Sequence, residues 1–418
     1  MKRDSLASAA SGLDRLLRKL GRVSDEEACL TRTFLSPAMG RANRLVGAWM
    51  QEAGLDVRED AFGNLIGRIE AHKPGARTLI LGSHLDTVRD AGRFDGALGV
   101  LLPIIVLRRL RREGVRLPFA VEVVGFSEEE GVRFSSAYLG SKGYAGAMRA
   151  ADLGLRDENG ISVRECLQEW SGRRDAWKTP GRAHSRRELL GYLEVHIEQG
   201  PVLEEHGLAC GVVSAIAGQT RARVEFAGRA GHAGTTPMAL RRDALAGAAE
   251  FIVVSEMLAK MRPPLVATVG RLEVRPGAAN VIAGGAELSL DIRHPADGDR
   301  REALRMLRSA ADRVAHKRGL KVSFQVVQDN PSVACSPGLT GLLAESVRSR
   351  QGKLLLLPSG AGHDGVVLSS LVPVAMLFVR CRGGVSHNPE EHVGKGDLAA
   401  SIEVVGDFLI RLARRNTE

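Results

Sequence analysis

Four short segments, far apart along the chain, carry the histidine and carboxylate side chains that can bind metal ions and transfer protons. They are GSHLDTVRDAGRFDG (residues 82–96), GFSEEEGVRF (125–134), YLEVHIEQGPVLE (192–204) and RGGVSHNPEEHV (382–393). Mixed nitrogen and oxygen ligands of this kind suit zinc, manganese, cobalt or nickel. Each segment alone also fits an ordinary turn, an acidic surface run or a structural histidine. Together they predict a site for two metal ions.

The histidines are candidate ligands, and the aspartates near the first of them have separate tasks. Asp86 stands two residues after His84 and can accept the proton of its second ring nitrogen. Asp95 lies in a glycine-rich loop that can return to His84. His196 lies in an apolar run, and His387 lies in a glycine-rich loop near the end of the chain.

Three adjacent glutamates, Glu128, Glu129 and Glu130, follow an apolar run, and they are costly there unless a positive charge lies among them. One of them can bind metal while its neighbour acts as a general base. No G-x-S-x-G nucleophile motif, phosphate-binding loop or strand–GxGxxG–helix motif competes with this interpretation. The residues therefore favour hydrolysis at two metal ions.

Alternating strands and helices are expected to bring the four segments to one edge of a sheet. Strands are predicted at Thr78–Gly82, Phe119–Phe126, Tyr192–Ile197 and Val374–Val379, helices at Ala97–Gly114 and Leu398–Arg415, and helices with connections over residues 1–70. This order predicts an α/β fold with a mostly parallel sheet covered by helices. Ligands bind at the carboxyl edge of such sheets.

The middle of the chain follows a different order. Strands are expected over Arg221–Ala227, Leu265–Val274, Ala286–Arg293 and Lys321–Val327, and helices over Arg241–Met261 and Asp299–Arg318. The order βαββαβ predicts a ferredoxin-like α+β domain inserted into the α/β domain. We therefore expect a catalytic domain made of residues 1–214 and 330–418, and an inserted domain at residues 215–329.

The composition argues against several other classes of protein. The 418 residues suggest two or three domains at about 150 residues each. The net charge is +9, but both signs are mixed and aromatic residues are only 4%, so nucleic-acid binding is not expected. Five cysteines without a C-x-x-C pair, no apolar leader and no long charge-free apolar run predict a reduced, cytoplasmic protein without a membrane span. A basic segment at residues 171–189 is best interpreted as a solvated loop.

The motifs GSHLDTV, FDG, EEEGVRF, HIEQGPVLE, GHAGTTPM, SGAGHD and SHNPEE occur in this order between residues 82 and 391. They resemble the dinuclear metal-dependent amidohydrolase and peptidase superfamily that includes aminoacylases. Within it they are most similar to the hydantoinase/carbamoylase branch, which contains allantoate amidohydrolases, N-carbamoyl-L-amino-acid hydrolases and some β-ureidopropionases. The resemblance covers essentially the whole expected fold.

The resemblance implies two divalent metal ions in each subunit. His84, Asp95 and His196 would hold one ion, and Asp95, Glu130 and His387 would hold the other, so that Asp95 bridges the two. The ions would be Zn²⁺ or Mn²⁺, with Co²⁺ and Ni²⁺ as alternatives.

The resemblance also implies which groups handle protons and charge. Glu129, directly before the ligand Glu130, would be the general base, and Asp86 would orient His84. His232 of GHAGTTPM would reach the active site of a partner subunit and stabilise the oxyanion there. The protein is therefore expected to be a homodimer, with the inserted domain serving for dimerisation and as a lid.

Contacts with the substrate are implied for Gln199, Asn280, Arg293, Gly360 and Ala361. Arg293 is chemically suited to this task because a planar guanidinium can bind a carboxylate through two parallel hydrogen bonds. The implied partner is a small molecule that carries both a ureido group and a carboxylate.

The activity that the resemblance implies is hydrolysis of the C–N bond of an N-carbamoyl group beside a carboxylate, with release of ammonia and carbon dioxide. Allantoate, N-carbamoyl-L-amino acids and N-carbamoyl-β-alanine all fit, and the sequence does not choose among them. An aminoacylase or peptidase acting on an ordinary amide is the alternative, although the EEEGVRF and HIEQGP motifs favour the ureido branch. A non-catalytic binding protein is the least favoured reading, because it would have a broken ligand set, and here every expected ligand is present.

Overall fold

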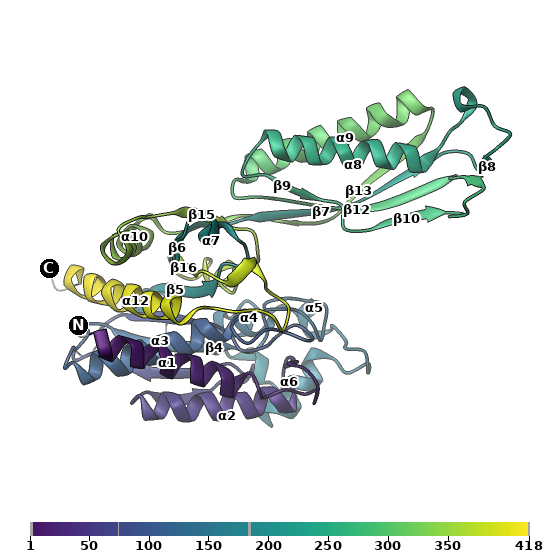
Figure 1. The fold of residues 1–418 in the computed structure, drawn as a ribbon. Helices are drawn as coiled ribbons and strands as arrows, with labels where there is room; N and C mark the ends of the chain where they lie inside the picture. Colours follow the sequence, from purple (N-terminus) through teal and green to yellow (C-terminus); the bar gives the residue numbers. More distant parts are fainter. Residues whose placement is uncertain (1–2, 74, 183–184, 417–418) are drawn as a thin grey trace. The chain divides into compact units, whose positions relative to one another are not determined.

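The computed structural model describes residues 3–73, 75–182 and 185–416 (Figure 1). Residues 183 and 184 of the basic segment and the first two residues of the chain lie outside this part. Within the described residues, no helix is both long and apolar enough to cross a membrane.

The chain forms two compact units. Unit 1 consists of Met1–Ser214, Cys335–Leu357 and Ala361–Glu418, and unit 2 consists of Ala215–Ala334 and Pro358–Gly360. The chain leaves unit 2 after residue 334 rather than after the predicted residue 329. The difference includes the short strand β14 (Val333–Ala334), which pairs with the end of β6 (Cys210–Ile216) in the large sheet of unit 1.

A mixed sheet, nine-stranded in the described part of the chain, forms the frame of unit 1, and its edge at β14 consists of residues assigned to unit 2. Its order is β1 (Asp56–Glu59), β2 (Leu65–Ile69), β4 (Ala120–Phe126), β3 (Thr78–His84), β5 (Leu189–Ile197), β16 (Val374–Val379), β6 (Cys210–Ile216) and β14, with β15 (Leu356–Ser359) beside β6. The central neighbours β4, β3, β5 and β16 run parallel, whereas the pairs toward β1 and toward β14 are antiparallel. The predicted α/β fold is confirmed, and its parallel part is this central group.

Helices cover the central strands of unit 1, so every residue of β3, β4 and β16 is buried. Helix α3 (Ala97–Arg112) packs on β3, β4 and β5 and contacts α1 (Arg3–Leu20) and α12 (Lys395–Arg415) (Figure 1). Strands buried on both faces are continuous apolar runs, which is why the sequence reveals them. The other helices of unit 1 in the described chain are α2 (Pro37–Glu52), α4 (Leu139–Ala145), α5 (Ala150–Leu153), α6 (Val163–Ser171), α7 (Val202–Glu205), α10 (Pro337–Gln351) and α11 (Gly365–Leu368). Unit 1 has 3-10 turns at Ala176–Lys178, Arg186–Glu188 and Arg382–Gly384, and unit 2 has one at Met238–Leu240.

Unit 2 has the expected ferredoxin-like order. Its elements are β7 (Gly218–Ala227), α8 (Ala244–Met261), β9 (Val266–Thr268), β10 (Leu272–Arg275), β12 (Gly285–His294), α9 (Asp297–Arg318) and β13 (Lys321–Asn330), with a small hairpin of β8 (Gly231–His232) and β11 (Val281–Ile282). The antiparallel sheet has the order β10–β12–β7–β13, with β9 also beside β12. Helices α8 and α9 pack on the sheet over a core that includes Val224, Phe251 and Leu307.

Two expectations about secondary structure are wrong. Residues 1–70 contain an antiparallel strand pair, β1 and β2, and not only helices and connections. The residues of β1 are mostly exposed, so they lack the apolar signal of a buried strand. The single strand expected at Leu265–Val274 is two strands, β9 and β10, with Gly270 in the segment between them.

Candidate metal centre and active site

The parallel strands of unit 1 bring the predicted site residues to one edge of the sheet. His84 is the last residue of β3, and Glu128 to Glu130 follow β4. His196 lies next to the end of β5, and the loop after β16 carries His387. Because these strands are parallel neighbours, their carboxyl ends meet at one edge of the sheet.

Asp95 lies at the centre of the resulting cluster, and each of its carboxylate oxygens faces different histidines. Oδ1 is 3.3 Å from His84 Nε2 and 3.1 Å from His196 Nε2. Oδ2 is 3.4 Å from His387 Nε2, which is also 3.4 Å from Glu130 Oε1. The structure thus brings all the predicted ligands together as two groups that share Asp95, which suits a carboxylate bridging two cations.

Hydrogen bonds prepare the two buried histidines to bind a cation. His84 Nδ1 lies 3.0 Å from the carbonyl oxygen of Asp86, and His196 Nδ1 lies 2.9 Å from that of Ile197. When each Nδ1–H donates to its carbonyl, the Nε2 atoms carry lone pairs, and these atoms face each other at 3.5 Å. Two lone pairs and the Asp95 carboxylate repel one another unless a positive charge lies among them.

The remaining oxygens of the cluster also fit a cation. Asp95 Oδ1 and Glu130 Oε1 are buried and have no hydrogen-bond partner among the described residues. The neighbouring carboxylates of Asp95 and Glu130 raise the pKa of His387 to about 10. The two carboxylates therefore favour an additional positive charge at this point, either a proton or a metal ion.

Asp86 holds the glutamate turn as well as facing His84. Its carboxylate oxygens accept hydrogen bonds from the backbone N–H groups of Glu129 and Glu130 at 3.0 Å. Its Oδ1 is 3.4 Å from His84 Nδ1. Glu129 is buried, and burial raises the pKa of its carboxyl well above the usual value. His84, Glu129 and Glu130 also offer ligand atoms within 4.8 Å of one another, so the assignment of base and ligand in this turn stays a prediction.

Three side chains tie two distant loops to Asp95. Gln199 Nε2 donates to Asp95 Oδ2 at 2.9 Å, while Gln199 Oε1 is buried and has no hydrogen-bond partner within the described chain. Ser386 Oγ donates to the same Asp95 oxygen at 2.8 Å. The Glu391 carboxylate accepts the backbone N–H groups of Asp95 and of the residue before it, at 3.0 and 2.7 Å. Ser386 and Glu391 are not among the residues predicted from the sequence, although both lie in the SHNPEE motif beside His387.

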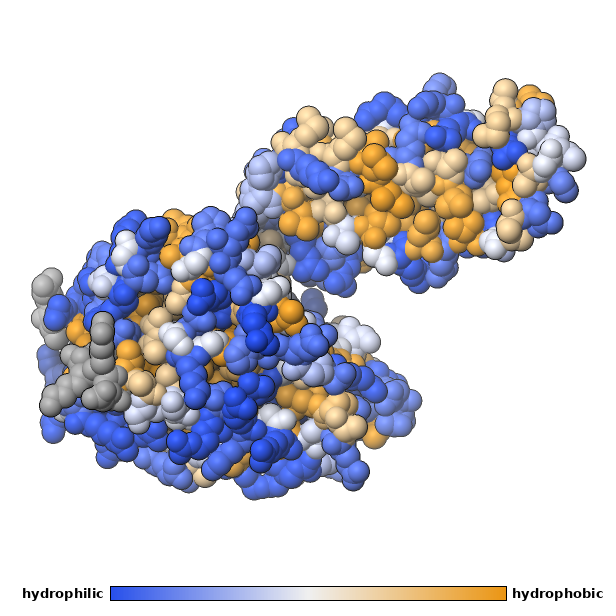
Figure 2. Space-filling model, in the orientation of Figure 1, coloured by the Kyte–Doolittle hydropathy of each residue, from blue (hydrophilic) through white to orange (hydrophobic). Residues whose placement is uncertain are grey.

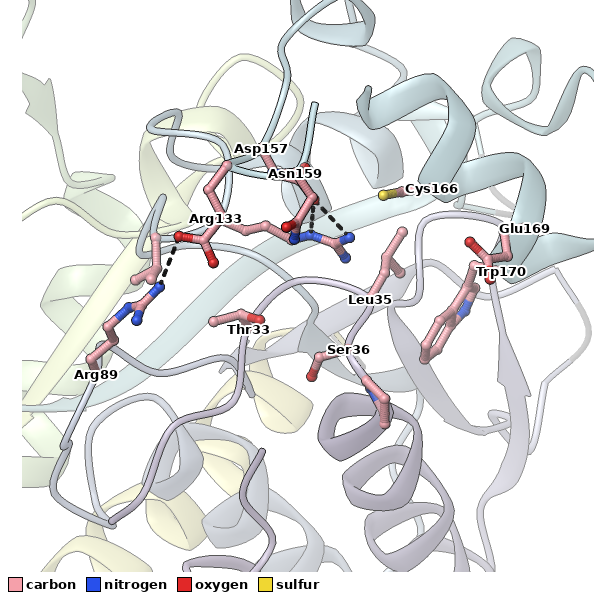
Figure 3. A pocket seen from close by; sticks show the side chains of 13 residues that line it. Thr33, Leu35, Ser36, Arg89, Arg133, Asp157, Asn159, Cys166, Glu169 and Trp170 are labelled. Carbon is pink, nitrogen blue, oxygen red and sulfur yellow. Dashed lines mark hydrogen bonds and ion pairs between the residues drawn. The ribbon is translucent and has the colours of Figure 1, made fainter. Parts of the chain in front are cut away.

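Arg133, three residues after Glu130, lines a cavity of about 620 Å³ (Figure 3). The Arg133 guanidinium donates to Asp157 at 3.0 Å and to the carbonyl oxygen of Phe34 at 2.8 Å. Arg89 and Glu158, 3.7 Å apart, also line the cavity. None of the residues that line it is a predicted ligand or base, so the cavity is separate from the Asp95 cluster.

The predicted substrate contacts of unit 2 lie in two places. His232 is an exposed residue of β8, and Asn280 directly precedes β11, the partner strand of β8. Arg293 lies on β12, and its Nη1 donates to the carbonyl oxygen of Gly360 at 2.6 Å. Ala361 is the first residue after the chain returns to unit 1. The roles of these residues toward a substrate stay predictions.

An α/β sheet whose carboxyl edge carries histidines around a shared carboxylate, together with an inserted ferredoxin-like unit, defines a metal-dependent hydrolase. Residues 80–411 match the profile of peptidase family M20/M25/M40, and the chain belongs to this family.

Individual relatives narrow the class further. The chain is 40% identical to an allantoate deiminase from Arabidopsis thaliana, over 94% of this chain and 80% of the relative. It is 39% identical to an N-carbamoyl-L-amino acid amidohydrolase from Geobacillus stearothermophilus, over 95% of this chain and 97% of the relative. A hydantoinase/carbamoylase family amidase from Burkholderia multivorans superimposes with a TM-score of 0.90 at 31% identity, over 97% of this chain and 98% of that one. The resemblance to the hydantoinase/carbamoylase branch is confirmed, and the protein is an amidohydrolase.

Proposed function

We propose that this amidohydrolase cleaves the ureido C–N bond of a substrate that also carries a carboxylate, such as allantoate or an N-carbamoyl-L-amino acid, and releases ammonia and carbon dioxide. The observation that carries the proposal is the Asp95-centred cluster, in which five potential ligands form two groups around one carboxylate. Relatives that align with 94% and 95% of the chain are named for these two substrates.

Two divalent ions, Zn²⁺ or Mn²⁺ with Co²⁺ and Ni²⁺ as alternatives, are the cofactors of this proposal. When bound, such ions polarise a carbonyl group and lower the pKa of water. The chain supplies three imidazole nitrogens and two carboxylates to hold them, and these donors already converge. Glu129, buried beside the cluster, accepts a proton from water and passes it to the leaving amine.

The remaining site residues orient the substrate. Gln199 is suited to a ureido group because Asp95 holds its Nε2, while its buried Oε1 has no partner among the described residues and can accept an N–H. Arg293 binds the carboxylate of the substrate through two hydrogen bonds. Asn280 and the backbone of Gly360 and Ala361 complete the contacts.

We also propose a homodimer in which His232 of one subunit stabilises the oxyanion in the other. The support is an exposed apolar stripe on α8, where Val253, Met257 and Met261 are 54%, 55% and 76% exposed. Their spacing of four residues aligns them on one face of the helix. Figure 2 shows the apolar surface over α8. A second copy of the chain would cover this stripe, as exposed apolar patches commonly mark interfaces.

The proposal is tested by measuring ammonia release from the metal-reconstituted enzyme. The panel is allantoate and several N-carbamoyl-L-amino acids, with N-acetyl amino acids as controls for cleavage of an ordinary amide, scored by release of the free amino acid. Turnover of allantoate alone would assign that substrate, and turnover of several carbamoyl compounds would assign a broader carbamoylase. Cleavage of the acetyl controls without any ureido turnover would make the enzyme an aminoacylase and overturn the proposal.

A further inference from the structure

One carboxylate of the unit 2 sheet, Asp291, is bound by more groups than an ordinary surface ion pair. Its Oδ2 accepts hydrogen bonds from Gln219 Nε2 at 2.7 Å, Arg221 Nε at 3.1 Å and Arg293 Nη2 at 3.1 Å. Its Oδ1 accepts one from Arg293 Nε at 2.9 Å. A cavity of about 750 Å³ on unit 2 is lined by Arg221, Asp291, Arg293 and Gly360 among others.

The sheet itself enforces this arrangement. Asp291 and Arg293 are two residues apart on β12, so their side chains lie on the same face. In the antiparallel register, Arg221 of β7 stands opposite Asp291, and Gln219 stands opposite Arg293. Partial burial works against ionisation of Asp291, but the hydrogen bonds and charges of the two arginines outweigh it and lower the pKa of Asp291. The carboxylate is therefore ionised at neutral pH.

Counting donors shows which part of Arg293 is left for a ligand. A guanidinium has five N–H groups. Asp291 takes the Nε–H and one N–H of Nη2, and the carbonyl oxygen of Gly360 takes one N–H of Nη1. Within the part of the chain that the structure describes, these bonds leave one N–H on each terminal nitrogen. Two donors on neighbouring nitrogens match the two oxygens of a carboxylate.

We propose that Asp291 is a positioning residue for substrate recognition, because it holds the inner side of the Arg293 guanidinium and leaves the terminal N–H pair for the substrate carboxylate. This inference rests on the proposed function. On this inference, unit 2 recognises a planar substrate group with two oxygens, such as a carboxylate, and not every anion.

A matched control lies on the same strand. Glu287 is four residues before Asp291, so its side chain lies on the same face of β12. It pairs with Arg271 at 2.8 Å and with Arg223 at 3.4 Å. Glu287→Gln therefore removes a comparable ion pair without altering a partner of Arg293.

The test is a double-mutant cycle on steady-state hydrolysis of an N-carbamoyl-L-amino acid that the wild-type enzyme cleaves. Asp291→Asn should raise KM roughly tenfold, the loss expected for a misdirected charged hydrogen bond, with kcat within about threefold of wild type. Glu287→Gln should leave both constants within about twofold. In an Arg293→Met background, Asp291→Asn should have no further effect on KM, because the group that it positions is absent.

Equal effects of Asp291→Asn and Glu287→Gln, or the same rise in KM with and without Arg293, would overturn the inference. Cooperative thermal unfolding shows whether the Asp291→Asn protein is folded. If it is not, the same double-mutant cycle is measured with Asp291→Ser in its place. A wild-type enzyme that cleaves no ureido compound would refute the proposed function before any variant is made, so the two failures are distinguishable.

Discussion

Asp95 joins two groups of potential ligands because each of its carboxylate oxygens faces different histidines. Two residues around it hold a backbone conformation that non-glycine residues seldom adopt, with φ of +58° at Gln199 and +54° at His387. Such conformations cost about 1–3 kcal/mol each and persist where the surrounding structure enforces them, commonly at functional sites. Of the non-glycine residues with positive φ in the described chain, these two lie within the Asp95 cluster, whereas others such as Leu35 and Tyr138 are not among its ligands.

Replacing Glu129 with glutamine tests the assignment of the base. The amide preserves the shape of the side chain but cannot accept a proton, so kcat should fall by about 10²- to 10⁴-fold. Both metal ions should stay bound, as measured by elemental analysis of the purified variant. Near-normal kcat with both ions in place would move the base elsewhere. Loss of an ion would instead make Glu129 a ligand.

Replacing His387 with alanine tests the second ligand group, of which His387 is the only histidine. The variant should retain one of two metal ions per subunit, because the group of His84, Asp95 and His196 is untouched. His206→Ala is the control, since His206 is exposed and outside both groups, and it should retain both ions. Two tightly bound ions in the His387→Ala protein would contradict the assignment.

At the scale of elements, the sequence predicts the buried parallel strands best because each is a continuous apolar run. The sequence does not reveal β1, because its residues are mostly exposed and show no apolar pattern. They form a strand by pairing with β2, and the local sequence does not encode this pairing. Nor does it reveal the contact between Glu391 and the backbone of Asp95. That contact forms between two loops that are far apart in the sequence, and local sequence patterns do not predict such tertiary contacts.

Close packing of α3 on β5 gives a prediction about stability. A Cβ on Gly99 would lie 2.2 Å from the carbonyl oxygen of Val195, the residue before His196. Gly99→Ala should therefore reduce the free energy of unfolding by about 1–3 kcal/mol, measured by denaturant titration. Gly341→Ala in α10 is the matched control.

The control should change stability in the opposite direction. Gly341 is exposed within α10, and a Cβ there would meet no heavy atom within 4 Å. Alanine at that position should stabilise the protein by about 0.5–1 kcal/mol. A Gly99→Ala variant as stable as wild type would show that α3 has room to move away from β5.

At the scale of the whole molecule, the order of elements was enough to predict an inserted ferredoxin-like unit, because strand and helix periods differ and turns separate them. Unit 2 ends at residue 334 rather than at the predicted residue 329, and the residues between these bounds include the two-residue strand β14. A dimer interface is harder to predict from the sequence. The apolar stripe of α8 can be identified only when the structure shows which side chains of the helix are exposed.

A mixed dimer tests whether His232 acts in the partner subunit. His232→Ala and Glu129→Gln homodimers should both be nearly inactive. A heterodimer of the two should regain activity, because one of its two sites would combine an intact Glu129 with an intact His232 from the other chain. A verified heterodimer without any recovery would place His232 outside the partner's site.

The central claim is that Asp95 bridges two metal ions, and anomalous X-ray diffraction from crystals of the zinc-reconstituted protein tests it most directly. Data collected at the zinc absorption edge should show two peaks in each subunit, one beside each carboxylate oxygen of Asp95. The first should lie against His84 and His196, and the second against Glu130 and His387. A single peak, or a pair of peaks away from Asp95, would contradict the account.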